Sequence, residues 1–209
     1  MDSRALGLYV AASLALIATP GQDMMYVVSR SLAQGRVAGL ASAVGVCLGI
    51  LVHTALAALG IGAILRASDG LFLAVKLAGA AYLMYLGARM LLAPGRAQAL
   101  GAPLPPASLP ALVRQGVLSN VSNPKIVLFF VAFLPQFVDP ASAHPTRDLV
   151  FLGVLYAVMA LPVKAAVGLA AGTFSERVLR SPRALAWMNR ASGAVLLALG
   201  VRLAVSERT

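Results

Sequence analysis

The stretch LVRQGVLSNVSNPKIVLFFVAFLPQFV, residues 112–138, determines the fold that we expect for this chain of 209 residues. It is apolar over most of its length, and Asn123-Pro124-Lys125 interrupts it near the middle. Proline removes a backbone hydrogen bond from a helix and its ring collides with the preceding turn, so a helix kinks or breaks there. The stretch exceeds the roughly 20 residues that cross a bilayer core as a helix. We therefore predict a transmembrane helix that is broken near Pro124.

Five further windows of the sequence have the length and apolarity of a transmembrane helix. A bilayer core about 30 Å thick is crossed by about 20 apolar helical residues. With the first stretch, the windows are 6–28, 38–65, 70–92, 112–138, 148–173 and 186–205. None shows the two-residue alternation that is typical of membrane β-barrel strands. The sequence therefore predicts an all-α, polytopic membrane protein with six transmembrane helices in one membrane domain.

The composition indicates lipid as the main solvent of the chain. Hydrophobic residues make up 60% and charged residues 11%, and the mean hydropathy is +0.87. A soluble domain carries about 25% charged residues, so this chain has too few to cover a globule in water. The formal net charge of +10 does not indicate nucleic-acid binding, because the arginines lie in short loops between apolar windows and not on one basic face.

The segment 93–111 divides the windows into two sets of three. It is rich in alanine and proline, which is typical of a flexible linker. The halves 1–92 and 112–209 look related, because Thr19-Pro20-Gly21 holds in the first window the place of Asn123-Pro124-Lys125 in the fourth. An odd number of spans per half makes the second copy inverted. Inverted repeats with interrupted helices, here the first and the fourth, place a transporter's site near the bilayer midplane.

The arginines predict the orientation in the membrane. Connections after windows one, three and five hold nine arginines, against five on the opposite side. The first set is Arg30, Arg36, Arg89, Arg96, Arg114, Arg177, Arg180, Arg183 and Arg190, and the second is Arg4, Arg66, Arg147, Arg202 and Arg208. Cytoplasmic loops are enriched in such cations. We therefore predict a bacterial inner-membrane protein with both termini in the periplasm.

Four ionisable residues fall inside the windows: Asp23, Lys76, Lys125 and Lys164. An ionised group in the bilayer core costs about 3 kcal/mol or more unless it faces a partner or a cavity. Counted from the nearest loop arginine, Asp23 and Lys125 lie about 10 and 16 Å deep at a rise of 1.5 Å per residue. Opposite charges at similar depth on two broken helices predict a facing pair that opens to bind substrate. A purely structural ion pair is the alternative.

The other candidate residues each have a structural alternative. Lys76 is six residues into window three, where its side chain can snorkel to the interface. Lys164 follows Pro162 in an apolar flank, so we expect it to face the interior. His53 lies in the middle of window two. Histidine titrates near neutral pH, which suits a proton relay, and a hydrogen-bonded packing histidine is the alternative.

Small and amide residues gather at the breaks and along the windows. The amides Gln22, Asn120, Asn123 and Gln136 accompany the breaks; they suit the ammonium and carboxylate of a zwitterion, and equally the capping of broken turns. Gly45 and Gly49, like Gly168 and Gly172, are spaced so that helices approach closely. The single cysteine, Cys47, excludes a disulfide and a thiolate zinc site within the chain.

The same segments carry a resemblance to a known family. They are Thr19 to Asp23, the glycines at 35, 39, 45 and 49, Lys76-Leu77-Ala78-Gly79-Ala80-Ala81-Tyr82-Leu83, Asn123-Pro124-Lys125 running to Phe129-Phe130, Leu134-Pro135-Gln136-Phe137 and the glycine-bearing last window. In this order and spacing they resemble the LysE/RhtB family of amino-acid exporters over nearly the whole chain. At the first break the family usually reads Pro-Gly-Pro-Asp, and here Gln22 replaces the second proline. Lys164 has no counterpart in the family pattern.

The resemblance implies export of small amino acids or their derivatives, such as homoserine, threonine, leucine or basic residues, driven by the proton motive force. The implied partners are an amino-acid-like substrate, protons as coupling ion and membrane lipid, without a cofactor; a monomer and a homodimer both stay open. A thiol–disulfide electron carrier needs two cysteines, and a heavy-metal cation exporter needs clusters of His, Cys or acidic residues. A membrane enzyme needs a nucleophile and base that converge, which the sequence does not show.

Overall fold

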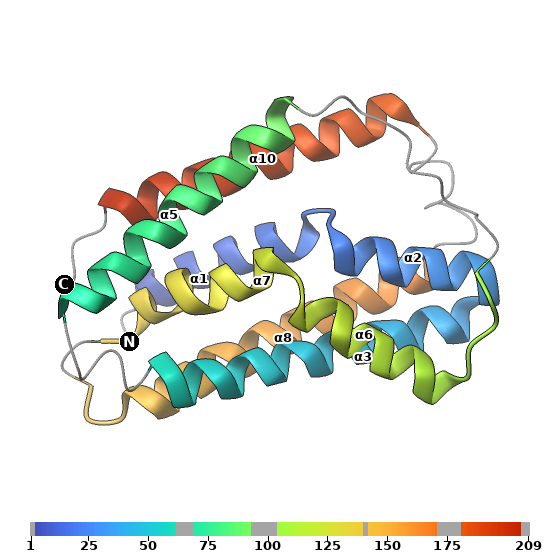
Figure 1. Cartoon of the computed structure of the whole chain (residues 1–209), viewed down its shortest axis with the longest axis horizontal. Helices are drawn as coiled ribbons and strands as arrows, with labels where there is room; N and C mark the ends of the chain where they lie inside the picture. The colour runs from blue at the N-terminus through green and yellow to red at the C-terminus, as the bar shows by residue number, and fades with distance from the viewer. Residues whose placement is uncertain (1–2, 62–68, 93–103, 140–141, 171–180, 206–209) are drawn as a thin grey trace.

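The computed structural model describes residues 3–61, 69–92, 104–139, 142–170 and 181–205. Helices account for the regular structure of these residues, and no strand occurs among them. In chain order they are α1 (Ser3–Ala18), α2 (Gln22–Gln34), α3 (Arg36–Leu56), the π-helical η1 (Ala57–Ile61), α5 (Asp69–Leu92), α6 (Leu109–Val121), α7 (Pro124–Leu128), the π-helical η2 (Phe129–Phe133), the 3-10 helix η3 (Leu134–Phe137), α8 (Pro145–Ala170) and α10 (Pro182–Val205). The all-α class is thereby confirmed (Figure 1).

Both predicted breaks are present in the structure. The axes of α1 and α2 differ by 47° across Pro20 and Gly21, and α6 meets the segment that begins with α7 at 54°. Pro124 is the first residue of α7, where its missing N–H costs nothing. The side chain of Asn123 caps this new helix, because its Oδ1 accepts a hydrogen bond of 3.1 Å from the amide of Lys125.

The described helices vary in how well they meet the requirements of a membrane span. Two continuous helices, Arg36–Gly60 and Pro145–Ala170, are long and apolar enough, and each bent pair also qualifies when it is counted as one span. Helices α5 and α10 form where windows 70–92 and 186–205 were predicted. The six-span arrangement itself stays a prediction.

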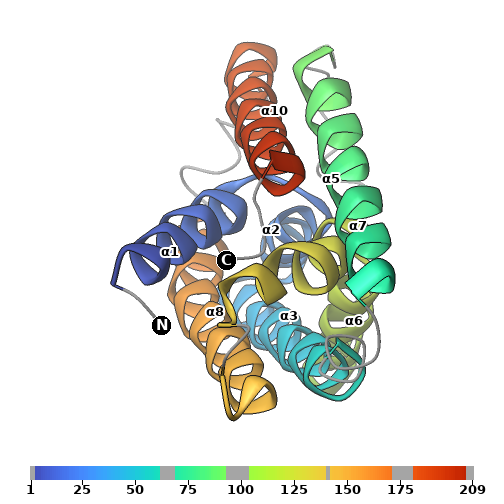
Figure 2. The same ribbon diagram turned by 90° about the vertical axis from the view of Figure 1, so that its left-hand side faces the viewer.

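The helices pack as a bundle with one projecting pair. Helix α3 contacts α2, α6 and α8 along its length, whereas α5 packs chiefly on α10. The pair of α5 and α10 stands to one side of the other helices when the molecule is viewed from its end (Figure 2). The Ser3 end of α1 and the Val205 end of α10 lie at the same end of the molecule (Figure 1). A chain that runs along the long axis an even number of times has both of its ends on the same side.

Glycines permit the closest helix contacts. A Cβ on Gly45 would collide with the backbone of Val113, and one on Gly49 would lie 2.6 Å from the Cβ of Asn120, so α3 and α6 are nearly in backbone contact. A Cβ on Gly168 would lie 3.1 Å from the backbone of Gly39, which brings α8 against α3. The small-residue packing predicted at these positions is confirmed, and Gly172 lies outside the described residues.

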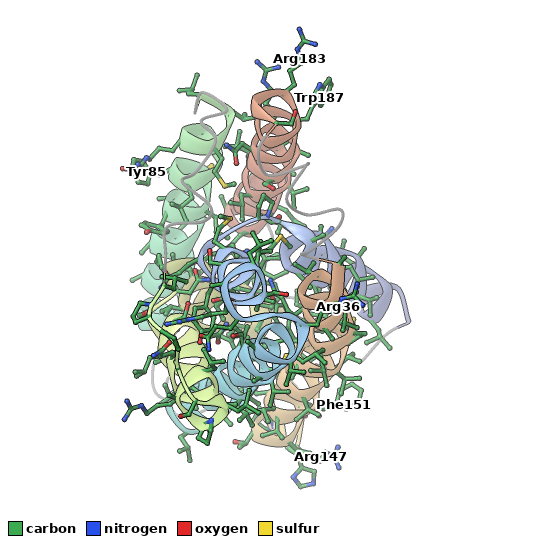
Figure 3. The ribbon with its side chains drawn as sticks, turned by 90° about the vertical axis from the view of Figure 1, so that its right-hand side faces the viewer. Arg36, Tyr85, Arg147, Phe151, Arg183 and Trp187 are labelled. Atoms are coloured by element: carbon green, nitrogen blue, oxygen red, sulfur yellow. The ribbon has the colours of Figure 1, made fainter. Side chains whose placement is uncertain are left out.

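Aromatic side chains divide between the interior and the outer surface. Phe129, Phe130 and Phe133 pack with Tyr9 and Tyr156 in the core. By contrast, side chains that project outward from α5, α8 and α10 include Tyr85, Phe151 and Trp187, which are 53%, 56% and 71% exposed (Figure 3). The ring contacts of Phe129 hold η2 against Tyr9 of α1 and Tyr156 of α8, and α7, which carries Lys125, directly precedes η2.

Candidate functional site

The first break exposes backbone carbonyls that lysines of the second half satisfy. Pro20 has no N–H, so the carbonyl of Leu16 has no helical donor four residues later. The ammonium of Lys125 donates to Leu16 O at 3.2 Å and to Thr19 O at 3.1 Å. Lys164 on α8 donates to Ile17 O at 3.4 Å. Two cations thus lie at the carbonyl end of α1, where the helix dipole favours positive charge.

The second break is completed in the same way by the first half. Pro124 removes the N–H that would bond the carbonyl of Asn120 from four residues later, and the amide of Asn123 donates to this carbonyl at 2.9 Å instead. Nε2 of His53 on α3 lies 3.2 Å from that oxygen, and a carbonyl can only accept, so the ring nitrogen carries the proton here. The ring also packs against Phe130, with centroids 5.6 Å apart. At each of the two breaks, the carbonyl that loses its i+4 donor to the proline therefore lies within hydrogen-bond distance of a side chain from the other half.

Asp23 also links the two breaks, because it lies at the start of α2 and bonds to the end of α6. It lies in the first turn of α2 and is 2% exposed. Its Oδ2 accepts a hydrogen bond of 2.8 Å from Nδ2 of Asn120, in the last turn of α6. The N-terminus of a helix favours a negative charge. Asp23 is therefore stabilised by its own helix and by the end of the other broken helix.

The direct pair predicted between Asp23 and Lys125 is not formed. In the described structure the carboxylate is bonded to Asn120, and the ammonium is bonded to Leu16 and Thr19. Lys125 binds these carbonyls because the broken turn of α1 presents two acceptors together. The prediction from depth was wrong about the contact, although both residues are buried at the place where the breaks meet.

The two breaks meet where Pro20 to Asp23 lie beside Asn120 to Lys125, a place that we call the crossing of the breaks. Three buried polar atoms at this crossing have no hydrogen-bond partner in the described structure. They are Oδ1 of Asp23, Oδ1 of Asn120 and Nδ2 of Asn123. Buried polar atoms are nearly always bonded in proteins. The crossing of the breaks therefore offers two acceptors and one donor beyond those used in its own structure.

The remaining predicted residues lie at varying distances from the breaks. Gln22 is exposed, and its Nε2 donates to Ser122 Oγ at 3.3 Å across the two breaks. Gln136 lies in η3, beyond η2 from Pro124, and its Nε2 donates to the carbonyl of Ala132 in η2. Lys76 is buried on α5, which packs on η2 and α10, so its side chain does not snorkel to an exposed surface.

A pocket of about 640 Å³ begins at the first break. Its walls come from the break, from α2, from α6 and α10 and from the segment before α6: Pro20, Gly21, Gln22, Met25, Tyr26, Ser29, Arg30, Leu104, Ser119 and Asn189. The sequence places Arg30 among the loop cations, and no motif in it distinguishes Tyr26, Ser119 or Asn189. Only the tertiary packing of α2, α6 and α10 brings these residues together.

Metal-ligating residues are sparse in the described structure. No group of three or more His, Cys, Asp or Glu side chains that could hold a metal ion occurs among the described residues. Cys47 is buried and free.

Comparisons of the sequence with known proteins find relatives that are named as membrane proteins and as efflux proteins. An uncharacterized membrane protein of Pseudomonas aeruginosa is 32% identical over 95% of this chain and 94% of its own length. One of Vibrio cholerae is 32% identical over 99% and 100%, and a leucine efflux protein of Klebsiella pneumoniae is 29% identical over 95% and 94%. No solved structure matches the chain significantly. The sequence model of the LysE type translocators matches residues 14–207, and the chain therefore belongs to this family.

Proposed function

We propose that this protein exports amino acids, with leucine and similar small neutral amino acids as the first class to test. Leucine efflux proteins of Klebsiella and Salmonella are among its relatives. In this proposal the halves 1–92 and 112–209 are inverted repeats of three spans each, joined by the linker 93–111. The outward apolar side chains of α5, α8 and α10 then face lipid, because a large apolar surface indicates a membrane contact.

The crossing of the two breaks is the observation that carries this proposal. Interrupted helices at matching positions of two repeats are where transporters bind their substrate. The unpartnered oxygens of Asp23 and Asn120 suit the ammonium of an amino acid, while Asn123 Nδ2 and the Lys125 ammonium suit its carboxylate. The site binds a zwitterion with groups of both signs, which a purely structural junction does not need.

Asp23 is the group that we assign to the coupling proton. Its carboxylate contacts Asn120, whose carbonyl is bonded to His53. A buried carboxylate that binds either a proton or a substrate ammonium couples the two fluxes in opposite directions. The proton and the ammonium compete for the same negative charge and do not occupy it together. Proton antiport follows, with His53 as the neighbouring titratable side chain.

Everted membrane vesicles test the function directly, because their outer face is the cytoplasmic one. We expect energised vesicles that contain this protein to take up labelled leucine, and we expect a protonophore to abolish that uptake. Vesicles from cells that lack the protein are the control. If a panel of neutral and basic amino acids gives no uptake above this control, the proposed function is wrong. Concentrative uptake that survives the protonophore would instead contradict proton antiport.

The proposed topology places the connections after spans one, three and five in the cytoplasm. We expect reporters fused after Arg96, which lies outside the described residues, to be active with a cytoplasmic enzyme and silent with a periplasmic one. The reason is the excess of arginine on this side of the protein. Fusions after Ser142 serve as the comparison and should show the opposite pattern. A periplasmic Arg96 fusion would reverse the orientation of the whole bundle.

A further inference from the structure

We propose that Arg30 forms a separate subsite that binds the carboxylate of the exported amino acid as it enters the pocket. This inference rests on the proposed function and extends it to a residue outside the crossing of the breaks. Arg30 lies in α2 and contributes to the wall of the 640 Å³ pocket that begins at the first break.

Among the described residues, no acidic side chain pairs with the buried guanidinium of Arg30. The residue is 8% exposed. Its Nη1 donates to Gln34 Oε1 at 3.2 Å and to Pro105 O at 3.1 Å, and its Nη2 donates to Gln115 Oε1 at 2.8 Å. A guanidinium has five N–H groups, so two remain without a partner in the described structure. All three acceptors are neutral, so no described residue compensates the positive charge.

The chemistry of the pocket selects a carboxylate as the ligand. Its described walls contain one cation, Arg30, and no acidic side chain, while Tyr26, Ser29 and Asn189 supply neutral polar groups. Burying a charge is costly unless the charge is paired. The planar fork of a guanidinium matches a carboxylate in geometry and in charge. A substrate carboxylate provides the missing partner.

A structural role of Arg30 does not explain its charge. The segment before α6 is already joined to α2 by Gln34, whose Nε2 donates to Ala107 O at 3.0 Å and whose Oε1 accepts from Ala107 N at 3.3 Å. A neutral side chain at position 30 would join the same carbonyl and amide oxygens without burying a charge. In the proposed subsite, this positive charge binds the carboxylate of the substrate.

The position of Arg30 predicts an effect on substrate capture. It lies seven residues after Asp23 on α2, which corresponds to about 10 Å along the helix. A single small amino acid cannot bind Arg30 and the crossing together. Arg30 therefore raises the affinity for substrate at the entrance, and the later steps at the crossing proceed without it. The signature is a change in KM with kcat retained.

The test measures leucine uptake in everted vesicles for Arg30→Gln, Arg30→Lys and two controls. Arg114→Gln removes an exposed cation from α6 outside the pocket, and Gln115→Leu removes a hydrogen-bond acceptor of Arg30 while keeping the charge. We expect Arg30→Gln to raise KM by about 10- to 100-fold, which is the loss of a hydrogen bond to a charged group, and kcat to stay unchanged. Arg30→Lys should give a smaller rise, and Arg114→Gln should keep the KM of the unmodified protein. Gln115→Leu, which keeps the charge of Arg30 and removes one of its acceptors, should raise KM less than Arg30→Gln does.

A second measurement separates this subsite from the proposed function. Leucine should raise the unfolding temperature of the purified protein more than leucinamide, which lacks the carboxylate, and Arg30→Gln should remove this difference. If the difference persists in Arg30→Gln, or if Gln115→Leu raises KM equally, Arg30 only joins the helices and the inference is wrong. If the unmodified protein shows this difference but transports no amino acid, the subsite stands and the proposed function fails. Should Arg30→Gln not fold, an unchanged KM and an unchanged preference for leucine in Arg30→Lys would overturn the inference.

Discussion

Lys125→Met and Asp23→Asn are each expected to reduce export by about 100-fold or more, because each neutralises a buried charge that binds the substrate or the proton. They act by different routes. Lys125→Met deprives the carbonyls of Leu16 and Thr19 of their donor and costs about 1–3 kcal/mol for each buried group left unpaired. Asn at position 23 can still accept from Asn120, so this variant keeps its fold and loses the titratable charge. Membrane abundance and efflux are measured separately to distinguish these routes.

The double variant decides how the two residues are coupled. Because the ammonium and the carboxylate share no hydrogen-bond partner, their effects on stability should add apart from the attraction between the two buried charges. Recovery of abundance in the double variant beyond that of Lys125→Met would show that they pair directly in another state of the transport cycle. Export by the double variant at the unmodified rate would show that both residues are structural. Normal export by either single variant would remove that residue from the mechanism.

Gly45→Leu is expected to prevent stable folding. Even a Cβ at this position would lie 2.9 Å from the Cα of Val113 and closer still to its carbonyl oxygen, and a backbone cannot move aside as a flexible side chain can. Overpacking of a tight contact costs about 1–3 kcal/mol and sometimes more, and a leucine requires α3 and α6 to separate along their whole contact. The unfolding temperature and the yield of monodisperse protein in detergent measure the effect.

Gly7→Leu is the matched control for this substitution. Gly7 also lies inside a helix, but a Cβ there would meet nothing within 4 Å. Replacing a helical glycine with a better helix former stabilises by about 0.5–1 kcal/mol, so the unfolding temperature should stay equal or rise. If Gly45→Leu and Gly7→Leu behaved alike, the close approach of α3 and α6 would not limit stability.

Local chemistry predicted the breaks, and only tertiary packing could reveal their partners. Pro20 and Pro124 each remove one backbone donor, a property of the residue itself, so the bends were found where the sequence placed them. The choice of partner for Lys125 depends on how the halves cross. Counting residues from a loop gives depth in the bilayer but no lateral position, and the expected pair with Asp23 failed for that reason.

Other residues show the same limit. His53 was correctly placed inside a helix, but its acceptor, Asn120 O, belongs to a distant segment. Arg30 falls near a helix end, where the sequence suggests a solvated cation, and packing against Pro105 in the segment before α6 and Gln115 in α6 buries it instead. Gln136 was grouped with the breaks because of its amide chemistry. In the structure it lies in η3, separated from Pro124 by η2, and it bonds to Ala132 instead.

The reciprocal contacts at the breaks have a mechanical consequence for the proposed transport cycle. Two contacts join the halves near the middle of the bundle: Lys125 bonds to α1, and Asn120 bonds to Asp23. When one rigid body turns against another, each point moves in proportion to its distance from the pivot. Hydrogen bonds at the pivot therefore stretch little, while contacts between the halves at the helix ends, such as that between Arg30 and Gln115, must break and reform. The protein can change which side is open without releasing the lysine that holds its centre.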